Sequence, residues 1–150
     1  MVTDLCPSAT NPEHTSKPDY FFDLQESAFK SLADASQGIL QMTFKVIPYP
    51  TTKNVGFMST STESYYLQGR FYNARYPILK AEYSLDGGIS FAPMQAVDPV
   101  KNNLYCIASK AIPSTIVFRL TDVHNQVIVT GSVNVPAKNS RTDLGKNFPY

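Results

Sequence analysis

The sequence has no tryptophan, few cysteines and histidines, and almost no net charge. Its 13 Lys and Arg residues nearly balance its 12 Asp and Glu residues, for a formal net charge of +1. That balance argues against a nucleic-acid-binding protein or a polybasic membrane anchor, because both need a concentrated positive field. No apolar run approaches the roughly 18 residues of a transmembrane helix. We therefore expect neither nucleic acid nor a membrane as a partner.

The two cysteines and two histidines predict no metal site. Cys6, Cys106, His14 and His124 are isolated in the sequence and match no zinc spacing. A disulfide between Cys6 and Cys106 would need Cα atoms within about 7 Å of each other. Sequence does not give that distance, so the redox state of the two cysteines stays open.

The composition nevertheless supports a folded chain that is rich in strands. Apolar residues make up 43% of the 150 residues and charged residues 17%, which is enough for a core and too little charge for a disordered chain. Eleven prolines together with nine Tyr and nine Phe favour short strands joined by turns over long helices. The length suits one ordinary domain plus a fragment.

Residues 1–50 predict a short strand, a loop, a helix and a second strand. The stretch from Cys6 to Asp19 contains three prolines and is predicted to be a loop. Apolar residues at helical spacing predict a helix over residues 25–35, with Gly38 as its stop. Alternation over residues 39–47 predicts a half-buried strand. This segment is too small to make a core of its own.

The second part of the chain changes to short strands and turn signals. Asp86-Gly87-Gly88 and His124-Asn125 mark turns between apolar runs. Seven strands without a helix predict a β-sandwich over residues 55–136. We expect residues 137–150 to form a mobile tail, with a docked piece at Phe148-Pro149-Tyr150. The predicted strands span residues 55–59, 64–73, 78–84, 90–94, 103–108, 115–121 and 126–135.

Two carboxylates in the first segment are candidates for catalysis. Asp4 and Asp23 could act as acid and base on either side of a glycosidic bond. The alternative, which we favour, is that Asp23 caps the predicted helix and Asp4 a turn, because Asp at such positions usually accepts backbone N–H bonds. The sequence contains no G-x-S-x-G motif and no glycine-rich phosphate loop. Little else points to an enzyme or to a cofactor.

Tyr65-Tyr66 is the most interesting pair for binding. Neighbouring strand residues point to opposite faces, so a regular strand would expose one ring and bury the other. If a bulge or strand end exposes both, the rings offer a platform for sugar rings and remove apolar area from water at roughly 25 cal/mol per Å². The other interpretation is an ordinary pair of sheet aromatics, as we read Tyr72. The residues alone leave the two readings open.

These segments, in this order, resemble the expansins and especially the microbial expansin-like proteins. In the first part of the chain, the matching stretches are Val2-Thr3-Asp4-Leu5, Phe22-Asp23-Leu24 with Ala28-Phe29, and Gly38 to Val46. In the second part they are Asn73 with Arg75 to Gly87 (RYPILKAEYSLDG), Phe118 to Asp122 (FRLTD) and Gly145 to Pro149. The resemblance covers nearly the whole chain.

The resemblance implies two packed domains. Residues 1–50 would be the C-terminal end of a six-stranded double-psi β-barrel, and residues 55–136 an immunoglobulin-like sandwich that binds cellulose. Expansins are secreted and loosen plant cell-wall polysaccharide networks without hydrolysis. The resemblance thus implies an extracellular, non-enzymatic protein that needs no cofactor and binds cellulose or a related β-glucan. We expect it to be a monomer.

Residue by residue, the resemblance assigns possible roles. Asp23 falls on the family's essential acidic position and Asp4 on its second acidic position. Tyr65 and Tyr66 fall on the aromatic pair of the cellulose-binding platform, and Tyr105 is the aromatic available for the third platform position. The catalytic candidates are thus Asp4 and Asp23, and the polysaccharide-binding candidates are the three tyrosines.

The resemblance begins near the end of the family's first domain. Most of the barrel would then be missing, together with the groups that face Asp23 across its groove. We expect Asp23 to be orphaned, and residues 1–50 to be loosely held or packed on the sandwich. The start of the chain also has neither the basic region nor the apolar stretch of a signal peptide. Both features would fit a truncated gene model or a fragment.

The leading hypothesis is a non-catalytic polysaccharide-binding module. One alternative is an immunoglobulin-like interaction module that kept the fold without glycan binding. The other, which we favour less, is a glycan-active enzyme that uses Asp4 and Asp23. Burial of both Tyr65 and Tyr66 would favour the interaction module.

Overall fold

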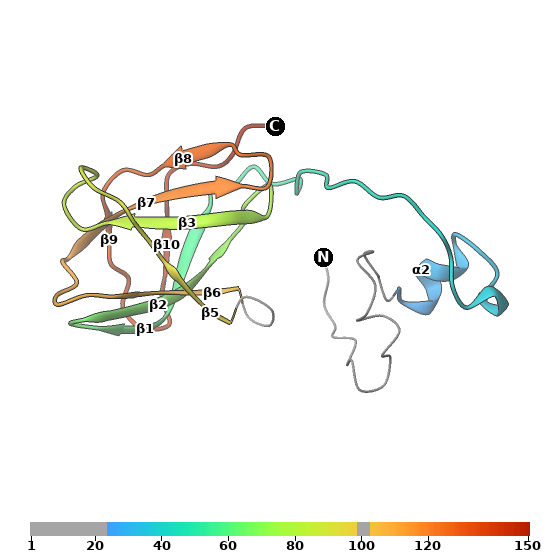
Figure 1. Cartoon of the computed structure of the whole chain (residues 1–150), viewed down its shortest axis with the longest axis horizontal. Helices are drawn as coiled ribbons and strands as arrows, with labels where there is room; N and C mark the ends of the chain where they lie inside the picture. Colours follow the sequence, from blue (N-terminus) through green and yellow to red (C-terminus); the bar gives the residue numbers. More distant parts are fainter. Residues whose placement is uncertain (1–23, 99–102) are drawn as a thin grey trace. The chain divides into compact units, whose positions relative to one another are not determined.

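The computed structural model describes residues 24–98 and 103–150 (Figure 1). The chain divides into two compact units, Met1–Phe44 and Lys45–Tyr150. The predicted loop at residues 6–19, the acidic candidates Asp4 and Asp23, and Cys6 lie outside the described residues.

The described part of the first unit is a short helical segment. The helix α2 (Glu26–Lys30) is followed by the 3₁₀ helix η1 (Ala35–Gln37). Asp34 caps η1, because its carboxylate accepts the backbone N–H of Ser36 at 2.8 Å. The helix predicted over residues 25–35 is therefore shorter than expected. No residue of α2 is buried, and without tertiary packing such a short helix gains little from further turns.

Residues 39–47 belong to neither of the two sheets. Their apolar side chains are largely exposed, with Ile39 68% and Ile47 65% exposed. The half-buried strand predicted here is wrong. An alternating pattern becomes a strand only where a neighbouring strand supplies the backbone partners.

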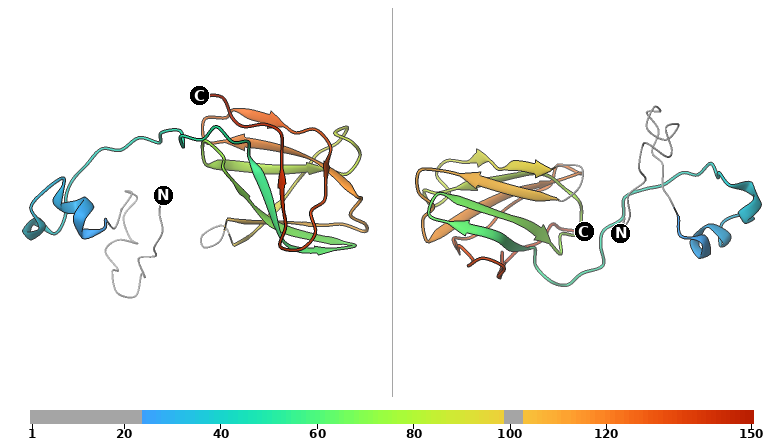
Figure 2. Two further views of the ribbon diagram at one scale, coloured as in Figure 1. Left: turned by 180° about the vertical axis from the view of Figure 1, so that it is seen from behind. Right: turned by 90° about the horizontal axis from the view of Figure 1, so that it is seen from below.

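The second unit contains two antiparallel sheets that face each other (Figures 1 and 2). Sheet A has the strand order β10-β1-β2-β6-β5, and sheet B the order β4-β3-β7-β8, with β9 also pairing with β7. Sheet A consists of β1 (Gly56–Glu63), β2 (Tyr66–Tyr72), β5 (Gln95–Asp98), β6 (Leu104–Ala108) and β10 (Arg141–Asp143). Sheet B consists of β3 (Ile78–Ser84), β4 (Ala92–Pro93), β7 (Thr115–Asp122), β8 (Val127–Val129) and β9 (Val133–Asn134).

Phenylalanine rings from both sheets fill the space between them. Phe57 on β1 packs against Phe71 on β2 with ring centroids 5.1 Å apart, and against Phe118 on β7 at 5.2 Å. Phe71 and Phe118 meet edge to face at 5.5 Å. All three rings are buried, which removes a large apolar area from water and fixes the inner face of each strand. The mainly β architecture is thereby confirmed, while the immunoglobulin-like and double-psi assignments remain predictions.

The C-terminal residues are docked rather than mobile. The strand β10 pairs with β1, and Leu144 and Phe148 are almost completely buried. The side-chain amide of Asn147 donates to the carbonyl oxygens of Lys53 and Asn73, each at 2.8 Å. The prediction of a mobile tail is therefore wrong, although the docked piece at Phe148 is confirmed. An apolar ring at the end of the chain supplies part of the core and holds the polar residues before it.

Candidate functional site

One face of β2 points away from the core and is free for contacts. Leu67, Gly69 and Phe71 are buried, so the alternate residues of β2 lie on the outer face of sheet A. The outer set is Tyr66, Gln68, Arg70 and Tyr72, and none of these side chains is fully buried. The outer face therefore has a tyrosine at each end of the strand.

The tyrosine pair, Tyr65 and Tyr66, lies at the hairpin between β1 and β2. Glu63 is the ladder partner of Tyr66, so Ser64 and Tyr65 form the two-residue connection. Tyr65 is 64% exposed and Tyr66 is partly exposed. Because Tyr65 lies in the turn and not in a strand, the inward–outward alternation of strand residues does not bury its ring.

The hairpin that carries the pair is held by the loop after β6. The carbonyl oxygen of Tyr65 accepts the N–H of Ser109 at 3.0 Å, and that of Ser64 accepts the N–H of Ile112 at 2.7 Å. These bonds fix the backbone on both sides of the turn. A ring on a fixed backbone loses less freedom on binding than a ring on a mobile loop.

The Tyr66 hydroxyl is hydrogen-bonded within its own strand. The hydroxyl donates to Oε1 of Gln68 at 2.9 Å, and Gln68 pairs across the sheet with the buried Cys106. Burial raises the pKa of the Tyr66 hydroxyl, and the neighbouring Cys106 thiol raises it further. The phenol is therefore a neutral hydrogen-bonding group at ordinary pH beside an apolar ring.

Tyr105 lies on the other face of sheet A. It pairs with the inward-facing Gly69, and its ring centroid is 5.5 Å from that of Phe71. Burial raises the pKa of its hydroxyl. The structure thus brings Tyr65 and Tyr66 together at the hairpin and places Tyr105 against the core.

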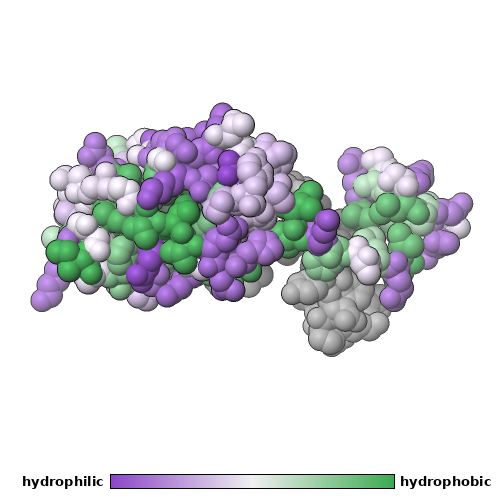
Figure 3. All heavy atoms as spheres, turned by 90° about the horizontal axis from the view of Figure 1, so that it is seen from above, coloured by the Kyte–Doolittle hydropathy of each residue, from purple (hydrophilic) through white to green (hydrophobic). Residues whose placement is uncertain are grey.

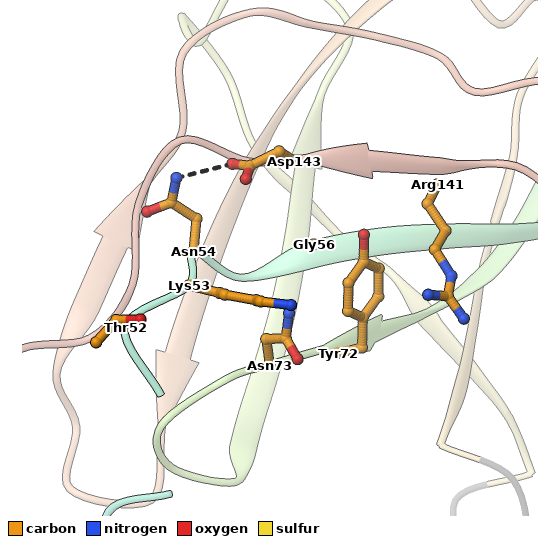
Figure 4. A pocket seen from close by; sticks show the side chains of 8 residues that line it. All are labelled: Thr52, Lys53, Asn54, Gly56, Tyr72, Asn73, Arg141 and Asp143. Carbon is orange, nitrogen blue, oxygen red and sulfur yellow. Dashed lines mark hydrogen bonds between the residues drawn. The ribbon is translucent and has the colours of Figure 1, made fainter. Parts of the chain in front are cut away.

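The other end of the outer face carries a polar hollow of about 420 Å³ around Tyr72 (Figure 4). The guanidinium carbon of Arg141 lies 5.3 Å from the centroid of the Tyr72 ring. The carboxylate of Asp143 accepts from Nδ2 of Asn54 at 2.9 Å. We call this site the Tyr72 hollow, and it is lined by Thr52, Lys53, Asn54, Gly56, Tyr72, Asn73, Arg141 and Asp143. This site was not predicted from the sequence, because the strand β10 was not predicted.

The outer side of sheet B carries exposed aliphatic residues on β8. Figure 3 looks onto the side of the sandwich that carries β8, where apolar residues are flanked by hydrophilic ones. Val127 and Val129 of β8 are 55% and 38% exposed. The ring of Phe91 is covered by the guanidinium of Arg119, whose carbon lies 4.2 Å from the ring centroid. The guanidinium of Arg119 is itself held by Glu82 through two hydrogen bonds.

Residues 24–98 and 103–150 contain neither a metal-ligating cluster nor a membrane-spanning helix. No three His, Cys, Asp or Glu side chains of these ranges gather in a way that could hold a metal ion. No helix in the same ranges is long and apolar enough to cross a membrane.

Comparisons with known proteins give a likeness of fold. No protein-family model matches the chain, and no curated protein matches it significantly. Among solved structures, a variant of the Clavibacter michiganensis expansin in complex with cellohexaose is similar, with a TM-score of 0.59 and 17% sequence identity. The same bacterial expansin without ligand gives a TM-score of 0.56 at 15% identity.

The likeness extends over most of this chain but only part of those structures. It covers 83% and 85% of this chain, and 59% and 61% of the two expansin chains. The resemblance to the expansins is therefore confirmed at the level of the fold, and the chain has an expansin-like fold.

Proposed function

We propose that the sandwich of this chain binds a cellulose-type β-glucan through the tyrosine pair, without hydrolysing it. The observation that carries the proposal is the exposed Tyr65 beside the partly exposed Tyr66 on a fixed hairpin. A β-glucan offers flat rings with apolar C–H faces and hydroxyl edges. The tyrosine rings match the first of these features, and the hydroxyl of Tyr66 and the amide of Gln68 match the second.

The likeness of fold supports the choice of ligand. One of the similar structures is described as an expansin in complex with cellohexaose, a short cellulose chain. The sequence resemblance also assigns this ring pair to the family's platform. We further propose, on this resemblance alone, that the full-length relative acts outside the cell on plant cell walls.

The non-enzymatic role is proposed for two reasons. The first is that both similar structures are expansins, and the resemblance implies that this family acts without hydrolysis. The tyrosine pair also offers hydrogen bonding and apolar surface but no pair of carboxyl groups of the kind that glycoside hydrolysis uses.

The test is a pull-down on microcrystalline cellulose. The wild-type chain should bind, and Tyr65→Ala/Tyr66→Ala should lose most of that binding while keeping its thermal unfolding transition. Tyr49→Ala is the matched control, because it removes a ring that is 57% exposed and lies before β1. The control should bind as the wild type does.

Two outcomes would overturn the proposal. Absence of binding by the wild type would favour an interaction module that has the fold but not the ligand. Release of reducing sugar from cellulose that disappears in Asp23→Asn would favour the glycan-active enzyme.

A further inference from the structure

The Tyr72 hollow combines an aromatic ring with two positively charged side chains and a net positive charge. Lys53 and Arg141 stand on either side of Tyr72 (Figure 4). Within the described residues, neither side chain forms an ion pair. The contrast with Arg119 is direct, because that guanidinium donates to both carboxylate oxygens of Glu82, at 2.7 and 2.8 Å.

The one carboxylate of the hollow is engaged by neighbours. Asp143 accepts from Nδ2 of Asn54 at 2.9 Å and from the N–H of Gly145 at 2.6 Å. Both bonds lie at the edge of β10 and hold the turn that leads to Leu144. The lining therefore carries two cations and one anion, and the anion is hydrogen-bonded to neutral donors.

The ring of Tyr72 packs directly over Gly56, which has no side chain. A Cβ at Gly56 would lie 2.2 Å from the ring carbon that bears the Tyr72 hydroxyl, so the ring rests where any other residue would place its first carbon. Gly56 and Tyr72 are ladder partners on adjacent strands. The ring thus lies against the sheet surface instead of standing away from it.

We propose that the Tyr72 hollow binds an acidic sugar unit, with its carboxylate near Lys53 and Arg141 and its ring against Tyr72. The choice of a sugar over other anions rests on the proposed function, but the site, the ligand class and the residues are different from those of the tyrosine pair. A carboxylate gains charge-assisted hydrogen bonds from both cations. A neutral sugar would gain only the contact with the ring.

The chemistry predicts a strong dependence on salt. Lys53 is exposed and Arg141 lies at the surface, so their attraction for a carboxylate is screened at high ionic strength. Binding of a neutral glucan to the tyrosine pair involves no charge and should change little with salt. The two sites can therefore be followed independently in one protein.

The test is binding to polygalacturonate, measured by affinity electrophoresis and by calorimetry with tri-galacturonate. Lys53→Gln/Arg141→Gln should bind polygalacturonate at least about tenfold more weakly than the wild type, because two charged hydrogen bonds are lost. Lys80→Gln is the matched control, since it removes one charge from sheet B, and it should change binding less than twofold. Fully methyl-esterified polygalacturonate, which is neutral, should bind the wild type weakly.

A second variant keeps every charge and moves only the ring. Gly56→Ala should push Tyr72 out of its place and weaken binding of tri-galacturonate severalfold, while Lys53 and Arg141 remain. Equal binding of the esterified and free polymers, or unchanged binding in Lys53→Gln/Arg141→Gln, would overturn the proposal. Cellulose binding by the same variants separates the outcomes, because it should be retained even if the acidic-sugar site does not exist.

Discussion

The two faces of β2 differ in burial: one face packs in the core and the other is partly exposed. On the inner face, Leu67, Gly69 and Phe71 are buried against the core. On the outer face, Tyr66 and Tyr72 remain partly exposed, each at one end of the strand. The inner residues therefore contribute to the stability of the sandwich, while the outer residues can vary with what it binds. Substitutions on the two faces should therefore separate stability from binding.

The largest effect is expected for a core ring of the inner face. Phe71→Ala removes a ring that contacts Phe57, Tyr105 and Phe118, and should lower the free energy of unfolding by about 3–5 kcal/mol. The neighbouring Arg70→Ala on the outer face should change it by less than about 0.5 kcal/mol. Urea denaturation followed by tyrosine fluorescence measures both. Similar losses of stability in the two variants would contradict a separation between the inner and outer faces of β2.

The next largest effect on stability is expected at Gly56 on β1 and Gly69 on β2. A Cβ at Gly69 would lie 2.4 Å from the backbone carbonyl oxygen of Met58 and from the ring of Phe57, both of which are fixed by packing. Gly69→Ala should therefore destabilise the fold by roughly 1–3 kcal/mol. Gly56→Ala meets only the ring end of Tyr72, a side chain that can swing outward, and should cost clearly less. Thermal unfolding of the two variants would contradict this reasoning if their order were reversed.

The ion pair on sheet B gives a smaller, pH-dependent effect. Glu82 is buried and binds Arg119 and Lys80, and the hydrogen bond from Arg119 is the main reason that its pKa falls from 4.5 to about 2. Because the pKa of the folded state is below that of the unfolded state, this stabilisation is complete above pH 4.5 and is lost as the pH falls toward 2.

Denaturation at a series of pH values tests this. The wild type should lose stability between pH 4.5 and about 2, and Glu82→Gln should lose less over the same interval. Some loss should remain in the variant, because the hydroxyl of Ser84 and its neighbours lower the pKa of Asp86 as well. An identical acid transition in the two proteins would mean that Glu82 does not contribute.

The sequence was sufficient for much of the sandwich but not for its outer sites. The strand predicted over residues 64–73 contains β2, which begins two residues later and ends one residue earlier, and the strand predicted over residues 78–84 has the bounds of β3. The strand β10 was missed because Arg141–Asp143 is short and polar, and its pairing with β1 depends on Leu144 and Phe148 entering the core. A pattern within a segment carries no information on a partner more than 80 residues away.

The same limit explains why one candidate site was predicted from the sequence and the other was not. Tyr65 and Tyr66 are adjacent in the sequence, so the pair could be recognised before the structure was known. The Tyr72 hollow joins Lys53, Tyr72 and Arg141 from three separate segments, and only the register of β10 on β1 brings them together. At the N-terminal side, the strand predicted over residues 39–47 failed for the converse reason, since its alternation was clear but it is not part of a sheet.

The most direct test of the central claim is a titration of the isotope-labelled chain with cellohexaose, followed by amide chemical shifts. If the tyrosine pair is the glucan site, the shifts should concentrate at residues 64–68 and at Ala108 and Ser109, which flank the hairpin. Residues of β8 on sheet B should not respond. Chemical-shift changes centred on sheet B, or no changes at millimolar cellohexaose, would contradict the claim that the tyrosine pair binds glucan.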